Sequence, residues 1–294
     1  MRSVLLAAAA LAAMAAAASA APPILKSPGA AMAPAAAKVA PPGPGEWRTV
    51  DPQNLLVIDT NQGRILVEMV PEIAPLSVAR IQELAHENFY DGLRFFRVVD
   101  DFMDQTGDPK NDGTGGSTKP NLPSEILFRR GADTPFVLAL DQTVAEIGFL
   151  KSIPVSSQSM ALAAMTRDQR VSAWGLFCPG VAGMARDATP DSANSQFFLM
   201  RGAYSSLDKH YTAWGRVVAG QSVVKAIKVG EPVADPQDLM ERVRLAADLP
   251  EKDRPKVRVV DTASGWFKLA IARARADKGA DFSACDVNFP AEVK

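Results

Sequence analysis

The stretch from Phe95 to Gly116 carries the side chains best suited to chemistry in this chain of 294 residues. It reads FFRVVDDFMDQTGDPKNDGTGG, so that Arg97 is followed closely by Phe102, Met103 and Gln105. These side chains place a guanidinium beside an apolar surface and an amide, and no histidine or cysteine lies among them to act as a base. Such a set suits a reaction in which a polar group is stabilised while no proton is transferred.

The rest of the sequence lacks the motifs of commoner catalytic sites. It has only two histidines, His86 and His210, and no HExxH, CxxC or GxSxG motif. The usual parts of zinc hydrolases, dithiol oxidoreductases and serine hydrolases are therefore missing. The segment DPKNDGTGG is similar to a calcium-binding loop, but Lys110 stands where a ligand is required and no glutamate ends the loop. We expect a glycine-rich turn there, and neither a metal nor a cofactor.

The elements that would position these side chains begin with a predicted β-hairpin. Two β-rich runs, Leu55–Thr60 and Arg64–Val70, flank the turn Asn61-Gln62-Gly63. Residues 74–92 then predict a helix, because apolar residues recur at helical spacing, Pro75 suits the first turn and a glycine ends the segment.

Further strand-like runs follow at 94–99, 195–202, 211–220 and 256–262, and a short amphipathic helix is predicted at 221–230. Many strands with only two helices in this core region indicate a β-barrel or sandwich with helical caps. They do not fit an array of alternating βαβ units.

Two segments lie outside this pattern. Residues 127–178 mix apolar runs with polar residues and show no clear periodicity. A connection this long within a compact domain is usually functional or forms a small structure of its own. Residues 264–279 predict a terminal helix that is basic on one side. We expect this helix to pack against the domain, with binding of a partner as the less favoured role.

The N-terminus has the features of an export signal. Arg2 gives a short positive region, Val4–Ala18 is an uninterrupted apolar run, and Ala18-Ser19-Ala20 has the small-x-small form of a cleavage site. The run is too short and too rich in alanine for a membrane-spanning anchor. We expect residues 1–20 to be a signal peptide, residues 21–46 to be an Ala/Pro-rich linker, and the mature protein to lie in a bacterial periplasm without a membrane span.

Charge and cysteine content set further bounds. The net charge of −1 provides no basic footprint for nucleic acid or for an anionic membrane surface. Because the periplasm is oxidising, the only two cysteines, Cys178 and Cys285, can pair as a disulfide. Two separate buried thiols are the alternative. The sequence does not fix the oligomeric state.

Three stretches, in this order, resemble the cyclophilin family of peptidyl-prolyl cis–trans isomerases. They are the Arg97 stretch quoted above, GMARDATPDSANSQFFLM, and LDKHYTAWGRV. The segment NLPSEI is also similar to the family's link out of the glycine turn. The resemblance implies a mainly β fold, a closed antiparallel eight-stranded barrel capped by two α-helices. It places an isomerase domain at 47–262, with an insert at about 127–178, and leaves 263–294 as a C-terminal extension that holds the terminal helix.

The resemblance also implies roles for individual residues. Arg97, Gln105 and Phe102 would be the catalytic residues. The substrate-binding residues would be Met103, Ala185, Arg186, Gln196, Phe198, Leu207 and Tyr211, with Phe102, Met103, Phe198 and Leu207 forming a pocket for the proline ring.

The sequence departs from the family at several positions. Ser206 stands where animal members have a tryptophan associated with cyclosporin binding, so we expect weaker contact with that drug. Tyr211 stands where many eukaryotic members have histidine. Phe96 replaces the usual histidine before the arginine, and Thr106 replaces a usual glycine. Arg186 replaces a common asparagine and adds a charge near the substrate groove.

Rotation about an X-Pro bond fits this residue set on physical grounds. The rotation breaks amide resonance against a barrier of about 18–20 kcal/mol. It makes and breaks no bond to hydrogen, so no general base is needed. A fixed guanidinium can stabilise the twisted transition state more than either planar state, by about 3–4 kcal/mol if it acts like an oxyanion donor.

The sequence thus predicts an isomerase of X-Pro bonds that acts during the folding of exported proteins. Its partners would be proline-containing polypeptides. One alternative is a proline-directed binding module or chaperone with little turnover. Another is an envelope protein that holds a partner through the linker and the terminal helix. The insert leaves the chain just before the GMAR segment, so it can either cover the substrate groove or extend it.

Overall fold

The computed structural model describes residues 40–294. The predicted signal peptide and most of the predicted linker lie outside the described residues. Within residues 40–294, no helix is long and apolar enough to cross a membrane.

An eight-stranded antiparallel sheet forms the centre of the fold, in the order β14-β2-β3-β13-β11-β12-β5-β4. The sheet curls until its two edges approach each other, and isolated bridges from Arg94 to Leu239 and from Val98 to Gly230 join the edges. The predicted barrel is confirmed, although bridges rather than a continuous ladder close it. The strands are β2 (Leu55–Thr60), β3 (Gly63–Met69), β4 (Arg97–Val99), β5 (Met103–Thr106), β11 (Val181–Met184), β12 (Phe197–Met200), β13 (Ala213–Ala219) and β14 (Met240–Leu245).

Two helices, α1 (Pro75–His86) and α2 (Gln221–Ala226), cap the barrel as predicted. The carboxylate of Glu125 accepts hydrogen bonds from the backbone N–H groups of Leu76 and Ser77, at 2.8 and 2.7 Å. These donors have no partner within a helix, so Glu125 caps the N-terminus of α1.

The predicted end of the first helix was wrong. The helix stops at His86 rather than near Gly92, and Asn88 adopts a left-handed φ of 57°. The turn that follows buries Tyr90 completely, and the Tyr90 hydroxyl donates to the carbonyl of Ser195 at 3.2 Å. Burial of this ring therefore decides where the helix ends.

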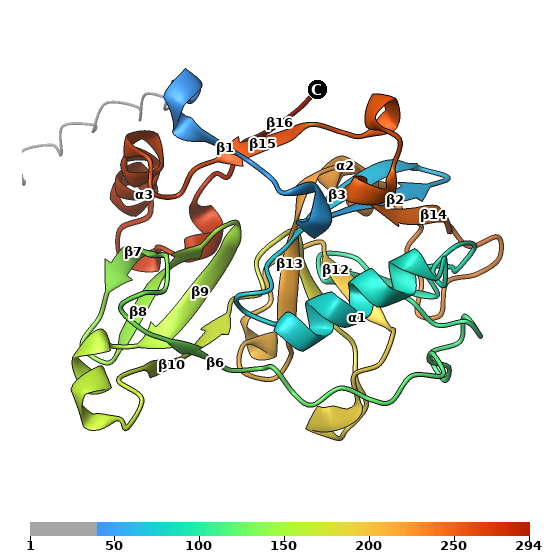
Figure 1. The fold of residues 1–294 in the computed structure, drawn as a ribbon, viewed down its shortest axis with the longest axis horizontal. Helices are drawn as coiled ribbons and strands as arrows, with labels where there is room; N and C mark the ends of the chain where they lie inside the picture. The colour runs from blue at the N-terminus through green and yellow to red at the C-terminus, as the bar shows by residue number, and fades with distance from the viewer. Residues whose placement is uncertain (1–39) are drawn as a thin grey trace, which may run out of the picture. The chain divides into compact units, whose positions relative to one another are not determined.

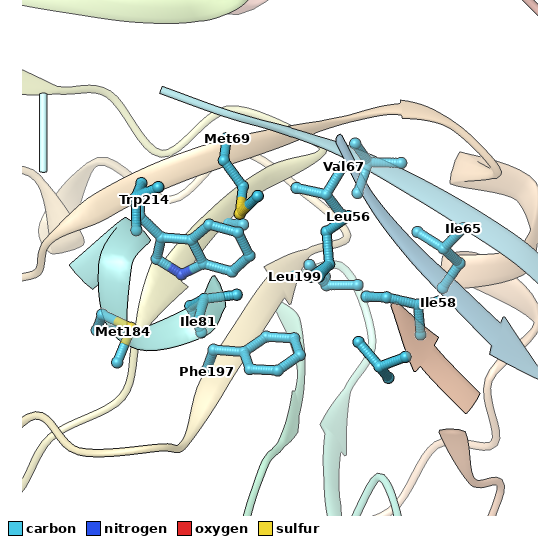
Figure 2. Packing of buried hydrophobic residues seen from close by; sticks show 14 of the residues in the cluster. Leu56, Ile58, Ile65, Val67, Met69, Ile81, Met184, Phe197, Leu199 and Trp214 are labelled. Atoms are coloured by element: carbon cyan, nitrogen blue, oxygen red, sulfur yellow. The ribbon is translucent and has the colours of Figure 1, made fainter. Parts of the chain in front are cut away.

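The core lies between α1 and the concave face of the barrel (Figure 2). Trp214 on β13 and Phe197 on β12 are fully buried, with ring centroids 5.6 Å apart in an edge-to-face arrangement. Ile81 of α1 points into the same cluster (Figure 2). Truncating either ring to alanine would cost about 3–5 kcal/mol. This rigid core supports the strands that carry the candidate site.

Residues 128–175 form a second sheet with five antiparallel strands, in the order β6-β10-β9-β8-β7 (Figure 1). Leu150, Ile153, Val155 and Ala173 of this sheet belong to the same buried cluster as the barrel core. The insert is therefore packed on the barrel. Its strands are β6 (Phe128–Arg130), β7 (Phe136–Asp141), β8 (Ala145–Leu150), β9 (Ile153–Gln158) and β10 (Val171–Gly175).

The C-terminal extension packs on the insert. Helix α3 (Gly265–Lys278) lies beside β7 and β8 in Figure 1, and the rings of Phe267 and Phe149 meet edge-to-face at 5.0 Å. Strand β15 (Val257–Val260) pairs with β1 (Trp47–Thr49) and β16 (Ala291–Val293) in a separate three-stranded sheet. The predicted terminal helix and its packing role are confirmed.

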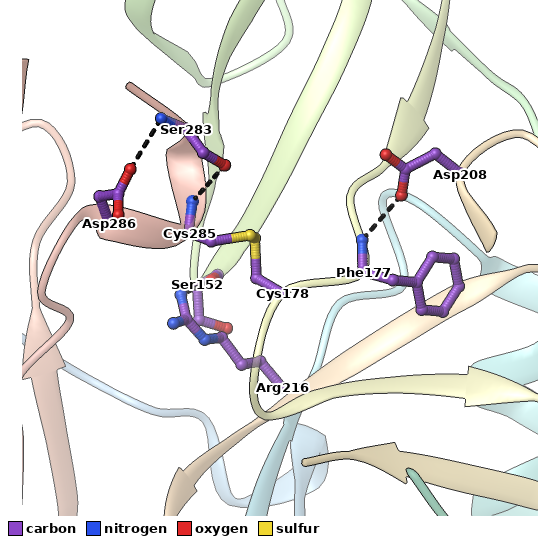
Figure 3. Close-up of a disulfide and its surroundings, with 8 residues drawn as sticks. All are labelled: Ser152, Phe177, Cys178, Asp208, Arg216, Ser283, Cys285 and Asp286. Atoms are coloured by element: carbon purple, nitrogen blue, oxygen red, sulfur yellow. Dashed lines mark hydrogen bonds between the residues drawn. A yellow bond between two sulfur atoms is a disulfide. The ribbon is translucent and has the colours of Figure 1, made fainter. Parts of the chain in front are cut away.

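A disulfide between Cys178 and Cys285 joins the end of the insert to this extension (Figure 3). Next to it, Arg216 of β13 reaches out of the barrel and donates to the carbonyl of Ser152 in the insert at 2.9 Å. The same guanidinium lies 5.2 Å from the ring centroid of Phe289 in the extension. Barrel, insert and extension therefore meet at Arg216. Burial lowers the pKa of the Arg216 guanidinium to about 10, and the nearby carboxylate of Glu68 opposes this shift.

The last residues of the predicted linker also contact the extension. The indole Nε1 of Trp266 donates to the carbonyl of Ala40 at 2.5 Å, and the Trp266 backbone N–H donates to the carboxylate of Glu46 at 3.2 Å. The chain is thus fixed to α3 before the barrel begins.

Candidate active site

Strand register brings the predicted catalytic residues together. Arg97 on β4 lies directly opposite Gln105 on β5, and Gln105 in turn lies opposite Phe198 on β12. Residues that are opposite each other in antiparallel strands point to the same face of the sheet. The guanidinium, the amide and the aromatic ring therefore share one face of the barrel.

These side chains surround a hollow of about 110 Å³, called here the Arg97 pocket. All predicted site residues line it except Gln196, which lies in an adjoining cavity of about 450 Å³ beside the glycine-rich turn. The lining residues of the Arg97 pocket are Arg97, Phe102, Met103, Gln105, Ala185, Arg186, Phe198, Leu207 and Tyr211.

The Arg97 side chain is held from two sides. Its Nε donates to the carboxylate of Glu231 at 2.5 Å, and its Nη1 donates to Oε1 of Gln105 at 3.3 Å. Its guanidinium carbon lies 5.9 Å from the centre of the Phe102 ring. No hydrogen bond within residues 40–294 uses Nη2, so this edge of the guanidinium is available to a bound molecule.

A chain of amides fixes the orientation of Gln105. Its Nε2 donates to Oε1 of Gln196 at 2.9 Å, and the Gln196 Nε2 donates to the carbonyls of Gly113 and Gly115 at 3.1 and 2.7 Å. The N–H groups of both side-chain amides are therefore bonded along the chain of amides, and Oε1 of Gln105 is left to accept from Arg97. Gln196 acts on the arginine through Gln105, a connection that the sequence does not reveal.

Asp108 forms the glycine-rich turn to which Gln196 is bonded. This buried carboxylate accepts hydrogen bonds from the backbone N–H groups of Lys110 and Gly113, at 2.8 and 2.6 Å. Gly113 has a left-handed φ of 90°, which a glycine adopts without strain. The carboxylate therefore acts as an internal cap of the turn. Among residues 40–294, no cluster of three or more histidine, cysteine, aspartate or glutamate side chains could hold a metal ion.

The floor and walls of the pocket are apolar. Met103, Phe198 and Leu207 are each at least 92% buried, with exposed fractions of 2%, 5% and 8%. Phe177, from the end of the insert, packs behind Phe198 with ring centroids 5.7 Å apart. The ring of Tyr211 meets Phe198 edge-to-face at 5.8 Å. A flat apolar ring could enter this hollow with little movement of the walls.

Arg186 is bound to the protein itself. Its guanidinium stacks 4.6 Å above the ring of Tyr211 and donates to the carbonyl of His210 through Nε and Nη2, at 3.1 and 2.8 Å. The charge predicted to lie near the substrate groove is therefore used to hold Tyr211 against the pocket.

Behind the pocket, Asp104 is a fully buried carboxyl on the opposite face of β5. Its Oδ1 accepts from Nη1 of Arg201 at 3.0 Å, while its Oδ2 has no hydrogen-bond partner. Burial raises the pKa of Asp104 to about 7 from its usual 3.8, and the nearby Arg201 only partly opposes this shift.

Three residues of the site were missed by the sequence analysis. Glu231 is 134 positions away from Arg97, Phe177 comes from the insert, and the ring of Tyr204 packs against Phe102 with ring centroids 4.4 Å apart. Tyr204 lies only three positions before Leu207, so its aromatic type was an available signal. Nothing near Glu231 or Phe177 in the sequence points to the pocket.

Comparison with known proteins gives consistent results. Residues 55–247 match the family model described as cyclophilin type peptidyl-prolyl cis-trans isomerase/CLD. A probable peptidyl-prolyl cis-trans isomerase from Brucella suis is 32% identical over 191 residues, which cover 61% of this chain and 74% of the Brucella protein. The peptidyl-prolyl cis-trans isomerase ppi1 from Schizosaccharomyces pombe is 30% identical over 168 residues, 57% of this chain and 81% of that protein. The crystal structure of cyclophilin AquaCyp293 from Hirschia baltica has a TM-score of 0.78 and 34% identity, covering 85% of this chain and 94% of that chain.

Proposed function

The chain belongs to the cyclophilin-type peptidyl-prolyl cis-trans isomerases, and we propose that it uses the Arg97 pocket to isomerise X-Pro bonds of exported polypeptides as they fold. One observation carries the assignment of the site. All of the predicted catalytic and binding side chains except Gln196, drawn from separate stretches of the sequence, surround one small hollow with apolar side chains on its floor and a guanidinium at its edge.

In the proposed mechanism the apolar wall holds the proline ring. Met103, Phe198 and Leu207 exclude water from the ring, and the edge-to-face contact of Tyr211 keeps Phe198 in place. With the ring fixed, the chain on one side of the imide bond can rotate against it. Uniform binding of both planar isomers alone would not accelerate this rotation.

Arg97 supplies the stabilisation that is specific to the transition state. As the imide bond twists, resonance is lost and the proline nitrogen gains a lone pair that can accept a hydrogen bond. A guanidinium already held by Glu231 and Gln105 can donate its free edge to the twisted group without reorganising. A donor of this kind contributes about 3–4 kcal/mol, which is about two to three powers of ten in rate.

Export is supported by two features of the chain. The first residues have the form of a cleavable signal peptide. The Cys178–Cys285 disulfide is stable in an oxidising compartment such as the periplasm. Proteins that fold after export from the cytoplasm pass through slow X-Pro isomerisation, so such an enzyme would act on them there.

Cell fractionation, with the N-terminal residue of the mature protein determined, would test this part of the proposal. We expect a periplasmic protein that begins at Ala21, and a cytoplasmic protein that keeps Met1 would contradict the proposal.

The assignment of the site is tested by a protease-coupled assay on a tetrapeptide with one X-Pro bond. We expect the wild type to accelerate isomerisation and Arg97→Ala to lose about 100- to 1000-fold in kcat/KM. Equal rates for the two proteins, or no acceleration by either, would instead favour a proline-directed binding module or chaperone.

A further inference from the structure

A second hollow lies beside the Arg97 pocket, where the insert meets the barrel. This hollow of about 640 Å³, called here the Trp174 groove, is open to solvent and is not filled by any part of residues 40–294. Leu127, which is 52% exposed, and the partly exposed Trp174 both line it. Its lining residues are Ser124, Ile126, Leu127, Gln158, Ser172, Trp174 and Lys209.

The alternation of β10 explains why Trp174 faces outward. Val171, Ala173 and Gly175 are buried, whereas Ser172 and Trp174 between them are partly exposed. The buried side packs on the barrel core through Ala173. The outer side of the strand therefore carries an aromatic side chain that is not part of the buried barrel core.

One short loop, residues 205–211, separates the groove from the Arg97 pocket. Its residues Leu207 and Tyr211 line the pocket, whereas Lys209 points the other way and places Nζ 3.8 Å from the centre of the Trp174 ring. Lys209 has a left-handed φ of 60°, and its side chain points toward Trp174. Residues 205–211 thus form a wall with the Arg97 pocket on one side and the Trp174 groove on the other.

This wall is fixed to the end of the insert. The carboxylate of Asp208 accepts a hydrogen bond from the Phe177 backbone N–H at 2.9 Å (Figure 3). The Phe177 carbonyl in turn accepts from the Tyr204 backbone N–H at 2.9 Å. Phe177 follows closely after Trp174 and packs behind Phe198 of the pocket. The wall between the pocket and the groove is therefore held in place by hydrogen bonds to the end of the insert.

We propose that the Trp174 groove binds an apolar or aromatic side chain of the same unfolded polypeptide whose proline occupies the Arg97 pocket. Leu127 and Ile126 offer apolar contact, and the partly exposed indole, over which Lys209 Nζ lies at 3.8 Å, adds aromatic surface beside them. Gln158 Oε1 already accepts from the Ser172 backbone N–H at 3.0 Å and Ser172 Oγ accepts from Arg129 at 3.1 Å, so the hydroxyls and the Gln158 N–H groups can serve as donors to the backbone carbonyls of an extended segment. The volume lies within the range of about 300–1,000 Å³ found for sites that hold a drug-sized ligand, which is enough for a large side chain and its neighbouring backbone. The insert then extends the substrate groove rather than covering it.

This inference rests on the proposed function, because the groove acts only on a chain that is turned over in the pocket. It predicts that substrates are distinguished by length. A tetrapeptide fills the pocket without reaching far into the groove, whereas an unfolded protein can occupy both. Contacts in the groove should lower KM for long substrates and leave turnover of short ones unchanged.

The test compares Trp174→Ala and Leu127→Ser with the wild type on two substrates. One is the tetrapeptide, and the other is a reduced, carboxymethylated protein whose refolding is limited by one X-Pro bond. We expect each variant to keep tetrapeptide activity within about twofold and to lose about tenfold in catalysis of refolding, mainly through KM. Leu138→Ser is the matched control, because Leu138 is 49% exposed on the insert but lies outside the groove; it should behave as the wild type.

The outcomes separate this inference from the proposed function. Wild-type behaviour of both groove variants on both substrates would overturn the inference and leave the isomerase activity standing. An equal loss on both substrates would also overturn it, because the residues would then only support the pocket. Failure of the wild type to accelerate either substrate would overturn the proposed function itself.

Discussion

The Arg97 pocket and the Trp174 groove share one wall but are built in different ways. Around Arg97, strand register, an ion pair and a chain of amides fix each polar side chain. Around Trp174, the outer side of β10 presents a partly exposed indole next to the exposed side chain of Leu127. A site that stabilises a twisted bond needs fixed donors, whereas a site that holds varied unfolded chains needs adaptable surface. The proposed chemistry therefore lies on the barrel, and the insert can contribute binding.

Removing the disulfide that joins the insert to the C-terminal extension should have the largest effect on stability. The disulfide closes a span of 107 residues, so the Cys178→Ser/Cys285→Ser variant should lose about 4–5 kcal/mol of unfolding free energy. Tetrapeptide activity should persist wherever the variant stays folded, because the strand register that pairs Arg97 with Gln105 does not depend on the disulfide. Denaturant unfolding with and without a reductant measures the effect. A reductant that leaves the wild type as stable as before would contradict this prediction.

Replacing Arg216, which joins the barrel to the insert, should have the next largest effect on stability. Arg216→Met removes the charged donor to the Ser152 carbonyl and should cost about 1.5–3 kcal/mol in unfolding free energy. Arg64→Met is the matched control, since Arg64 makes an exposed ion pair with Asp59 at 2.6 Å and should cost less than about 1 kcal/mol. Equal losses for the two variants would show that Arg216 does not hold the insert on the barrel.

Within the barrel, Asp104 should make stability depend on pH. Its pKa is raised by burial from 3.8 to about 7, so the folded protein binds this proton more tightly than the unfolded chain does. Its contribution is complete below about pH 4 and is lost as the pH rises toward 7, with a slope of up to about 1.4 kcal/mol per pH unit. Asp104→Asn should remove this slope. Parallel curves of unfolding free energy against pH for the two proteins would refute the assignment.

The smallest effect should come from the ion pair that holds Arg97. Glu231→Gln keeps a hydrogen-bond acceptor but removes the charge, so we expect kcat/KM for the tetrapeptide to fall by about two- to fivefold at low salt. Asp235→Asn is the control, because Asp235 forms a similar exposed pair with Arg94, at 3.0 Å and away from the pocket. If both variants behave alike, Glu231 has no special part in orienting Arg97.

The sequence was most informative where local spacing and chemistry coincide. Arg97, Phe102, Met103 and Gln105 lie on a short hairpin, so their spacing alone brings them near one another. The first hairpin and both capping helices also follow from local periodicity and turn residues. In contrast, Glu231 reaches Arg97 only through the closure of the barrel, which no local pattern encodes.

The five-stranded sheet of the insert could not be predicted from the sequence, and the reason is physical. Strand β9 is buried at every position from Ile153 to Ser157, because one side packs on the barrel and the other faces the extension, so the alternation of a half-exposed strand is lost. A register shift between Leu138 and Leu140 interrupts the pattern of β7. The role of Phe177 and the Trp174 groove depended on this unpredicted sheet.

The central claim is that Arg97 stabilises the twisted imide bond rather than the bound peptide. NMR exchange on a proline peptide measures both the dissociation constant and the rate of interconversion on the enzyme. For Arg97→Ala we predict a dissociation constant within about threefold of the wild type and an interconversion rate at least about 100-fold lower, while Arg94→Ala leaves both unchanged. A variant that loses binding and interconversion in equal proportion, or that keeps the wild-type rate, would contradict this account.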